Sequence, residues 1–415
     1  MQGLLARRPG ARRRTTGALL VLALTFVLAA CTPPFPGDDA FYRPPSPLPA
    51  SEPGDVLSSR PSRFTLDPIA KTPVAGVTAR QVLYRSTDAL GQPMAVSGTV
   101  LVPDAPWTGG GSRPLVSYAV GTRGVGDDCA PSYTLSQGAD YEGLFIKALL
   151  DRGWAVAVSD YQGLGTPGTH TYMVGPAQGH AVLDMARAAL RLPDTDLSPS
   201  TPVGLMGYSQ GGGAAGWAAE LAGSYAPELD VRGAAVGGVP GDLTATAEFL
   251  DGSPFVAFAL MAALGLDAAY PELDLESYLN DRGRALIERS QDLCLVSVDG
   301  FATLISVAFT RIDDYVTTNP LDTGAWRARL EESRLGRRAP AAPVYQYHAV
   351  VDEIVPYEQA ADLRRTWCDG GGNVTWTALP LAEHALGLVQ GQGPGAEWLA
   401  DRFAGEPATS NCSRP

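Results

Sequence analysis

A short apolar strand, a sharp turn and the start of a helix follow one another between residues 202 and 222, and this stretch constrains the fold more than any other. The apolar run at 203–206 leads into Gly207-Tyr-Ser-Gln-Gly211, and an alanine-rich helical segment follows. Gly-x-Ser-x-Gly in this setting is a nucleophile elbow, in which a strained turn exposes the serine and the positions two before and two after it must lack a Cβ. We therefore predict that Ser209 is a nucleophile.

Three glycines in a row, Gly211 to Gly213, follow this serine. Each costs up to about 1 kcal/mol relative to alanine in a helix, so we expect backbone or substrate to approach closely there. The free N–H groups at the helix start, with that of Gln210 first, face the space where an oxyanion would form. On this stretch alone, a plain strand-turn-helix crossover without chemistry remains an alternative.

A second N–H group for the oxyanion is expected from the loop after the strand predicted at 114–120. That loop reads Gly-Thr-Arg-Gly at 121–124, so the amides of Thr122 and Arg123 are the candidates. The alternative is that these residues only form a turn.

The base that such a serine needs can be sought among only four histidines. His170 lies in a glycine-rich loop, His180 opens a predicted helix, and His348 lies within a predicted strand. His384 follows the last predicted strand in a loop, and it alone gives the order serine, acid, histidine with the base at the carboxyl edge of the sheet. We predict His384 as the base and a packing role in its loop for His170.

The orienting carboxylate is expected just past the strand predicted at 344–350, where Asp352 and Glu353 stand side by side. The alternation of the strand and the short reach of aspartate favour Asp352 over Glu353. Asp160 ends an earlier strand and precedes the serine in sequence, so we expect it to make structural hydrogen bonds.

Strands alternate with helices on both sides of the elbow, which predicts a mostly parallel, doubly wound sheet covered on both faces. Two antiparallel strands joined around Leu90-Gly91 are expected to start this sheet. The predicted strands lie at 81–85, 94–102, 114–120, 154–160, 203–206, 231–239, 344–350 and 374–379, and the predicted helices at 141–152, 180–192, 214–222, 357–367 and 395–403.

The alternation stops after Pro240, and residues 241–339 are helical in pattern, with helices predicted at 254–266, 275–290, 301–309 and 325–335. We interpret 241–339 as an inserted helical cap or lid between two parts of one core, 76–240 and 340–415. The predicted helix at 254–266 is apolar nearly all round. It is therefore either packed in the interior or lines an apolar pocket.

The amino terminus has the pattern of an export signal. Five arginines precede a short apolar run at 18–30, which is too short to span a bilayer and predicts a signal peptide at 1–30. Leu28-Ala-Ala-Cys31 resembles a bacterial lipobox, so we expect lipid on Cys31 and a protein anchored on the outer face of the cell membrane. The alternative is ordinary signal-peptide cleavage with no role for Cys31, which gives a secreted protein. Residues 31–75 read as a proline-rich tether and N-terminal arm.

Four cysteines remain besides Cys31, an even number that suits an oxidising compartment. The sequence allows three pairings, of which we favour Cys129–Cys294 and Cys368–Cys412, because the second ties the tail to the body. A disulfide at Cys129 would also hold the 121–124 loop against the cap. No cysteine or histidine spacing predicts a metal site. The net charge of −13 argues against nucleic acid as a partner.

These residues together resemble the secretory lipases of the lipase A type, a family of α/β hydrolases. The matching stretches lie at 116–118, 129–133, 160–170, 207–212 and 352–357. The resemblance implies an α/β-hydrolase fold with an inserted helical cap, a triad of Ser209, Asp352 and His384, two disulfides and no cofactor.

The resemblance also implies an activity, because family members hydrolyse triacylglycerols and simpler carboxylic esters, and some transfer acyl groups. We expect a lipid or small ester as the substrate and a monomeric protein. Two alternatives remain on the sequence: an acyltransferase of the cell envelope with the same triad, and a catalytically inactive, lipid-anchored binding protein.

Overall fold

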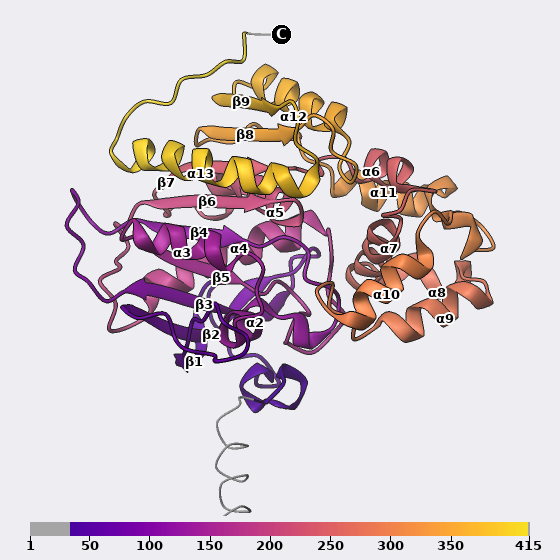
Figure 1. Cartoon of the computed structure of the whole chain (residues 1–415), viewed down its shortest axis with the longest axis horizontal. Coiled ribbons are helices and arrows are strands. Elements are labelled where there is room, and N and C mark those ends of the chain that lie inside the picture. Colours follow the sequence, from indigo (N-terminus) through magenta and orange to yellow (C-terminus); the bar gives the residue numbers. More distant parts are fainter. Residues whose placement is uncertain (1–33, 414–415) are drawn as a thin grey trace, which may run out of the picture.

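The computed structural model describes residues 34–413, so the predicted signal peptide and Cys31 lie outside the described residues. Its centre is a nine-stranded sheet with the strand order β1-β2-β3-β5-β4-β6-β7-β8-β9 (Figure 1). The strands are β1 (Val56–Ser62), β2 (Val77–Thr87), β3 (Pro93–Pro103), β4 (Leu115–Ala119), β5 (Ala155–Ser159), β6 (Val203–Tyr208), β7 (Val231–Gly237), β8 (Val344–Ala349) and β9 (Val374–Leu379).

Strand direction divides the sheet into two parts. β1, β2, β3 and β5 pair antiparallel, whereas β5, β4, β6, β7, β8 and β9 run parallel. Leu90-Gly91 lies between β2 and β3, as predicted. The central strands β4, β5 and β6 are buried along their whole length, because helices cover both faces of the parallel part. The prediction of a mostly parallel, doubly wound sheet is confirmed.

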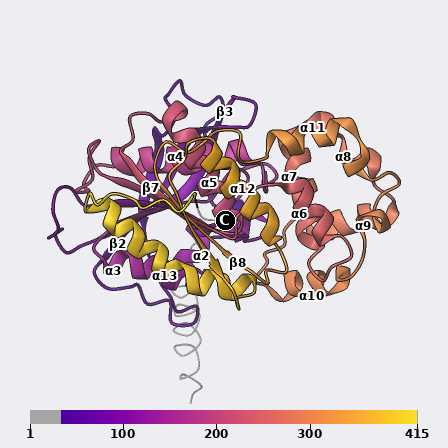
Figure 2. The ribbon, with the colours of Figure 1, turned by 90° about the horizontal axis from the view of Figure 1, so that it is seen from above.

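The core helices form two layers. Figures 1 and 2 show α3 and α13 on one face of the sheet and α4, α5 and α12 on the other. The core helices are α2 (Pro131–Gln137), α3 (Gly143–Asp151), α4 (Gly175–Arg191), α5 (Gln210–Tyr225), α12 (Tyr357–Asp369) and α13 (His384–Phe403). Within residues 34–413, none of the helices combines the length and the apolar character needed to cross a membrane.

The segment between β7 and β8 is helical and stands to one side of the core (Figures 1 and 2). Its helices are α6 (Leu243–Leu250), α7 (Ala257–Ala269), α8 (Leu275–Tyr278), α9 (Asp281–Ser290), α10 (Val298–Val307) and α11 (Gly324–Glu332). The single helix predicted at 275–290 is wrong, since α8 and α9 are separate. Asn280 is extended there, and its side chain caps α9 by accepting the Gly283 N–H at 3.0 Å, which starts a new helix.

The segment predicted as a tether and arm, 31–75, contributes an edge strand that the sequence analysis does not anticipate. β1 lies within it and pairs antiparallel with β2. Arg60 of this strand donates to Asp39 at 2.6 Å and to Gln81 at 2.7 Å, and the buried Tyr42 hydrogen-bonds Ser132. β1 escapes prediction because it is half exposed and polar, as edge strands commonly are.

The last core helix also begins earlier than predicted. α13 starts at His384, whereas the sequence predicts a helix only from 395 and places His384 in a loop. Glycines and Pro394 within the helix hide its start. Two of these glycines allow close packing on the sheet, because a Cβ on Gly387 would lie 2.4 Å from the Tyr208 hydroxyl and one on Gly391 only 1.9 Å from the Tyr347 ring.

Alanine substitutions at a closely packed and at an exposed helical glycine should therefore differ in their effect on stability. Gly391→Ala forces a methyl group into the Tyr347 ring, and we expect it to lower the free energy of unfolding by roughly 1–3 kcal/mol. Gly223→Ala, at an exposed position of α5, is the matched control, since its added Cβ would make only an ordinary contact at 3.5 Å with Ala341, and we expect it to be neutral or stabilising by up to about 1 kcal/mol. Urea unfolding measures both, and equal effects would contradict this account of the helix.

Candidate active site

Ser209 occupies a strained turn between β6 and α5. Its backbone has φ 58° and ψ −123°, a conformation that residues with a side chain rarely adopt. A Cβ on Gly207 would lie 2.3 Å from the Gly211 carbonyl oxygen, and one on Gly211 would lie 2.0 Å from the Ala119 carbonyl oxygen of β4. Close backbone contacts on both sides of the serine thus explain why the elbow requires glycine at these two positions.

The glycines after Ser209 differ in how closely other parts of the backbone approach them. A Cβ on Gly212 would lie 2.1 Å from the Gly237 carbonyl oxygen of β7, so backbone approaches closely there, as expected. A Cβ on Gly213 would make only ordinary contacts, the nearest at 3.5 Å from Pro240. Close backbone approach therefore explains Gly211 and Gly212, and nothing in the structure explains Gly213.

One continuous chain of hydrogen bonds joins the three predicted residues. His384 Nε2 lies 2.9 Å from Ser209 Oγ, and His384 Nδ1 lies 2.7 Å from Asp352 Oδ2. With the Nδ1 proton donated to the carboxylate, Nε2 is free to accept the serine proton. The arrangement can deprotonate the serine as it attacks an electrophile.

The carboxylate of Asp352 is fixed from several directions. Its Oδ1 accepts the N–H groups of Ile354 at 2.9 Å and Val355 at 2.8 Å, which leaves Oδ2 for His384. Burial pushes the pKa of Asp352 upward, but the hydrogen bond from His384, the nearby imidazoles and the N–H of Val355 outweigh it, so the pKa lies below its usual value. The carboxylate is therefore charged at neutral pH.

Glu353, the rival of Asp352, positions the backbone of the base instead. Its Oε2 accepts the N–H of His384 at 3.0 Å, while Glu383 caps α13 by accepting the N–H groups of Ala385 and Leu386. The Tyr208 hydroxyl donates to the His384 carbonyl oxygen at 2.7 Å. The first turn of α13 is thereby held in place around the imidazole. The sequence analysis weighs Glu353 only as a rival acid and misses this second task.

The other three histidines are not part of the chain of hydrogen bonds that joins Ser209, His384 and Asp352, although His348 Nε2 lies 3.5 Å from Asp352 Oδ2. His170 donates from Nδ1 to the Gln162 carbonyl oxygen at 2.8 Å and accepts the Gln210 side-chain amide on Nε2 at 3.1 Å. Burial lowers the pKa of His170 to about 4, so it is neutral and able to accept. His180 hydrogen-bonds a carbonyl oxygen at 3.1 Å, and His348, whose pKa burial also lowers, donates to one at 3.0 Å.

The loop after β4 lies beside the serine and is held by buried charges. The Arg123 guanidinium contacts Asp140 at 2.8 Å and Glu142 at 3.1 Å, and Glu142 also accepts the Gly121 N–H at 2.8 Å. Thr122 lines the same hollow as Ser209 and His384, and Arg123 is not among the described residues that line it. Thr122 is therefore the better placed of the two oxyanion candidates.

Two disulfides join segments far apart in the sequence, with the pairing favoured above. Cys129–Cys294 connects the segment after the 121–124 loop to the cap, and Cys368–Cys412 ties the tail to α12. The loop itself also bonds the cap, since the Leu295 N–H donates to the Arg123 carbonyl oxygen at 2.8 Å. The 121–124 loop and the cap are thus held together covalently and by backbone hydrogen bonds.

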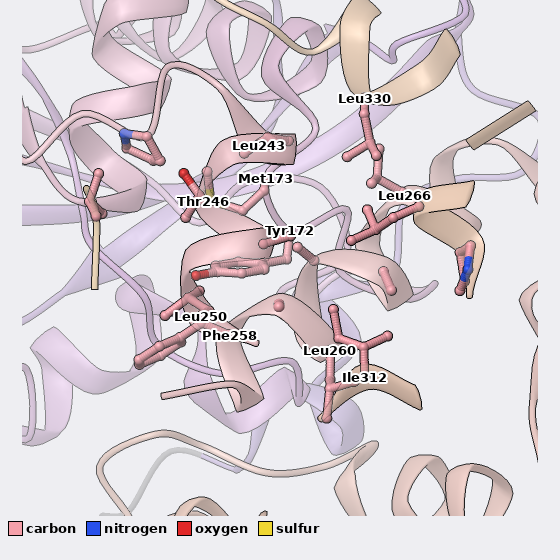
Figure 3. Close-up of a pocket in the computed structure, with 18 of the residues that line it drawn as sticks. Tyr172, Met173, Leu243, Thr246, Leu250, Phe258, Leu260, Leu266, Ile312 and Leu330 are labelled. Atoms are coloured by element: carbon pink, nitrogen blue, oxygen red, sulfur yellow. The ribbon is translucent and has the colours of Figure 1, made fainter. Parts of the chain in front are cut away.

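A hollow of about 780 Å³, including its open mouth, leads from Ser209 into the cap. Figure 3 shows side chains from α6, α7 and α11 pointing into it, among them Leu250, Phe258 and Leu330. The described residues that line it include no charged side chain. The apolar helix predicted at 254–266 is therefore a pocket-lining helix, and α7 forms one wall of the hollow.

Comparison with known proteins agrees with this geometry. The profile of the family described as secretory lipase matches residues 130–411. The chain belongs to the secretory lipase family. Its fold is that of the α/β hydrolases, since the structure of Candida antarctica lipase A in its closed state superimposes with a TM-score of 0.81 at 29% identity over 93% of this chain and 90% of that one.

Relatives of this chain are named with different activities. A secreted triacylglycerol lipase of Malassezia globosa is 32% identical over 92% of this chain and 82% of its own length. A protein of Mycobacterium tuberculosis is 35% identical over 91% of this chain and 85% of its own, and it is named a probable inactive lipase. Family membership supports an ester hydrolase, and the secreted relatives together with the two disulfides are consistent with export.

Asp160 is fully buried, and among the residues described its carboxylate hydrogen-bonds only structural neighbours. Its carboxylate accepts the N–H and hydroxyl of Ser132 and the hydroxyl of Ser97 at 2.6 Å. Burial raises the pKa of Asp160 to about 6 in spite of these hydrogen bonds. This matches the structural role that its position in the sequence suggests.

The raised pKa of Asp160 makes a stability prediction with a definite sign. The folded state holds the Asp160 proton more tightly than the unfolded chain does. This difference therefore contributes fully to the free energy of unfolding below pH 4, and the contribution is lost as pH rises through about 6. Between pH 4 and 7 we expect the wild type to lose up to roughly 3 kcal/mol relative to Asp160→Asn. Urea unfolding of both proteins measures the difference, and parallel curves would refute it.

Proposed function

We propose that the protein is a serine carboxylic ester hydrolase that cleaves lipid esters, such as triacylglycerols, or simpler acyl esters. The observation that carries this proposal is the unbroken chain of hydrogen bonds from Asp352 through His384 to Ser209. This chain ends at the wall of an uncharged, apolar hollow that has room for an alkyl group. Family membership independently supports the same class of reaction.

The reaction proceeds through a covalent ester on the serine. Ser209 Oγ attacks the carbonyl carbon while its proton passes to His384 Nε2, and Asp352 stabilises the imidazolium that forms. The N–H groups of Gln210 and Thr122 receive the developing oxyanion. His384 then gives the proton to the departing alcohol. Water, deprotonated by the same imidazole, attacks the acyl group and releases the acid and Ser209.

The apolar hollow suits the acyl chain of the substrate. Burying each methylene contributes roughly 0.8 kcal/mol, so a long chain gains more from an apolar wall than a short one. A charged acid or a polar acyl group would leave its water shell for a lining of leucine, alanine and aromatic side chains. Neutral esters with extended alkyl chains are the class of substrate that this lining favours.

The amino-terminal sequence supports a proposal about where the protein is located. We propose that it is exported by the signal peptide at 1–30 and held on the outer face of the cell membrane by lipid on Cys31. The even number of remaining cysteines supports an oxidising compartment.

Removing the nucleophile tests the chemistry directly. We expect Ser209→Ala to escape labelling by a fluorophosphonate probe and to lose at least about 10⁴-fold in kcat on a short p-nitrophenyl ester. Ser224→Ala, at an exposed serine of α5, is the matched control and should behave as the wild type. Equal labelling of wild type and Ser209→Ala would refute the proposal. A wild type that is neither labelled nor active would indicate a binding protein instead.

The hollow makes a separate prediction about chain length. Ala262 of α7 lines it, so Ala262→Phe fills part of the space that a long acyl chain would occupy. We expect kcat/KM for twelve-carbon acyl esters to fall about tenfold or more relative to four-carbon esters, a loss of two or so buried methylenes. Ala285→Phe, on an exposed position of α9, should leave the profile unchanged. An unaltered profile in Ala262→Phe would place the acyl chain elsewhere.

A further inference from the structure

The loop between β5 and α4, residues 160–174, is buried beside the active site, although loops normally run over the surface. We call it the β5–α4 loop. Apart from the half-buried Gln162 and the exposed tip at 167–169, its residues are buried. The loop closes on itself, because the Gln162 carbonyl oxygen accepts His170 Nδ1–H at 2.8 Å and the Thr171 N–H at 3.3 Å. It is therefore a compact unit that can hold side chains in fixed positions.

The backbone is strained near both ends of this loop. Tyr161 has φ 67° and Met173 has φ 65°, in the left-handed region that residues with a side chain seldom adopt. Residues in such conformations cost free energy, persist only where the surrounding structure enforces them, and cluster at functional sites. The strain is explained if the β5–α4 loop has to present particular side chains to the residues around Ser209.

One side chain of the β5–α4 loop contacts the residue that follows the nucleophile. Burial holds the pKa of His170 at about 4, so with Nδ1–H donated to Gln162 its Nε2 carries a lone pair at neutral pH. This Nε2 accepts the side-chain amide of Gln210 at 3.1 Å, and Gln210 is only 2% exposed. Gln210 is the first residue of α5, and its backbone N–H is the first of the two donors proposed for the oxyanion. His170 therefore fixes the side chain of a residue whose backbone faces the reacting carbonyl group.

Two tyrosines of the same loop contact the segment that carries the second proposed donor. The Tyr172 hydroxyl hydrogen-bonds Thr122 Oγ1 at 2.8 Å, and the Tyr161 hydroxyl donates to the Val120 carbonyl oxygen at 2.9 Å. Figure 3 shows Tyr172 among the side chains around the hollow at Ser209. The ring of His170 lies 6.2 Å from that of Tyr161 and 6.0 Å from that of Tyr172. The three side chains thus form one cluster that bonds both halves of the proposed oxyanion site.

We propose that the β5–α4 loop positions both N–H donors of the oxyanion site, and that His170 and Tyr172 are the positioning residues. The proposal rests on the proposed function, because it assigns the oxyanion to the N–H groups of Gln210 and Thr122. His170 acts through the Gln210 side chain, and Tyr172 acts through the Thr122 hydroxyl. Preorganised donors stabilise the oxyanion more than the ground-state ester, so misplacing them lowers kcat more than it raises KM.

Two substitutions of His170 separate its bond to Gln210 from its bond within the loop. His170→Asn keeps an N–H in the place of Nδ1, where it can donate to the Gln162 carbonyl oxygen, but it has no group in the place of Nε2. His170→Gln places an amide oxygen where Nε2 accepts the Gln210 side chain. His180→Asn is the matched control, because His180 also bonds a carbonyl oxygen through Nδ1 but makes no bond to Gln210 or Thr122 among the described residues.

We expect His170→Asn to lose about tenfold or more in kcat on a short p-nitrophenyl ester, with KM within about twofold of the wild type. His170→Gln should recover most of this loss, and His180→Asn should match the wild type. A histidine that only packs in its loop predicts the reverse order, with His170→Asn the milder change. That order, or wild-type kcat in His170→Asn, would overturn the proposal.

Gln210→Met tests the same bond from its other end and serves also where a His170 variant does not fold. Methionine keeps the backbone N–H and a side chain of similar length but has no amide, so we expect a loss of kcat similar to that of His170→Asn. Adding His170→Asn to Gln210→Met should have little further effect, because both changes remove one bond. Wild-type kcat in Gln210→Met, or losses that multiply in the double variant, would contradict the role of His170.

The second arm is tested by Tyr172→Phe, which removes the hydroxyl that bonds Thr122. We expect kcat to fall by about three- to tenfold with KM within about twofold. Tyr84→Phe is the matched control, since Tyr84 is a buried tyrosine of β2 whose hydroxyl bonds Ser159, and it should keep the wild-type kcat. Equal kcat in Tyr172→Phe and Tyr84→Phe would remove Tyr172 from the proposal.

A measurement without turnover separates this proposal from the proposed function. The ¹⁵N relaxation of the Gln210 side-chain amide reports how rigidly it is held, and Gln210→Met identifies its signal. We expect the amide to be rigid in the wild type and in His170→Gln and mobile in His170→Asn. An amide that is equally rigid in His170→Asn would overturn the proposal. A wild type with a rigid amide but no turnover of the ester would defeat the proposed function alone.

Discussion

The close approach of helix α5 to the central strands is the constraint on which the rest of the site depends. Gly211 sits against the Ala119 carbonyl oxygen, so no side chain separates the helix from the sheet. This contact holds Ser209 in its strained turn and directs the helix start at the same space as the serine hydroxyl. In the proposed reaction, one packing contact therefore places both Ser209 and the Gln210 N–H that would bind the oxyanion, while Asp352 and His384 reach that point from the segments that follow β8 and β9.

The cap acts on the site through α7 and the 121–124 loop. α7 is a shared wall, since its side chains line both the hollow that contains Ser209 and a second hollow beneath α10. The disulfide Cys129–Cys294 and the bond from Leu295 to Arg123 attach the cap to the loop beside the oxyanion. The cap, which lines the hollow at Ser209, and the loop proposed to bind the oxyanion are thus joined to each other at one edge of the sheet.

The sequence predicts the features that depend on nearby residues and on where strands end. The elbow needs glycine at two positions, and the order of Ser209, Asp352 and His384 follows from where strands end, so both can be read without coordinates. The start of α13 cannot be predicted from the sequence. Its glycines are needed because Tyr208 and Tyr347 lie close to them, and only the tertiary structure brings these residues together. The partners of Arg123 and the task of Glu353 were missed for the same reason, since they depend on contacts across the tertiary structure.

The hydrogen bonds of the triad all come from the core, and the described cap contributes none of them. The carboxylate of Asp352 accepts the backbone N–H groups of Ile354 and Val355. The first turn of α13 is held by hydrogen bonds with Glu353, Glu383 and Tyr208. In the proposed function, the reacting groups therefore lie in the core, and the cap that lines the hollow is a separate segment of the chain. For the proposed ester hydrolase, we expect mutations between β7 and β8 to change which esters enter the hollow while Ser209, His384 and Asp352 stay in place, which gives this architecture room to diversify.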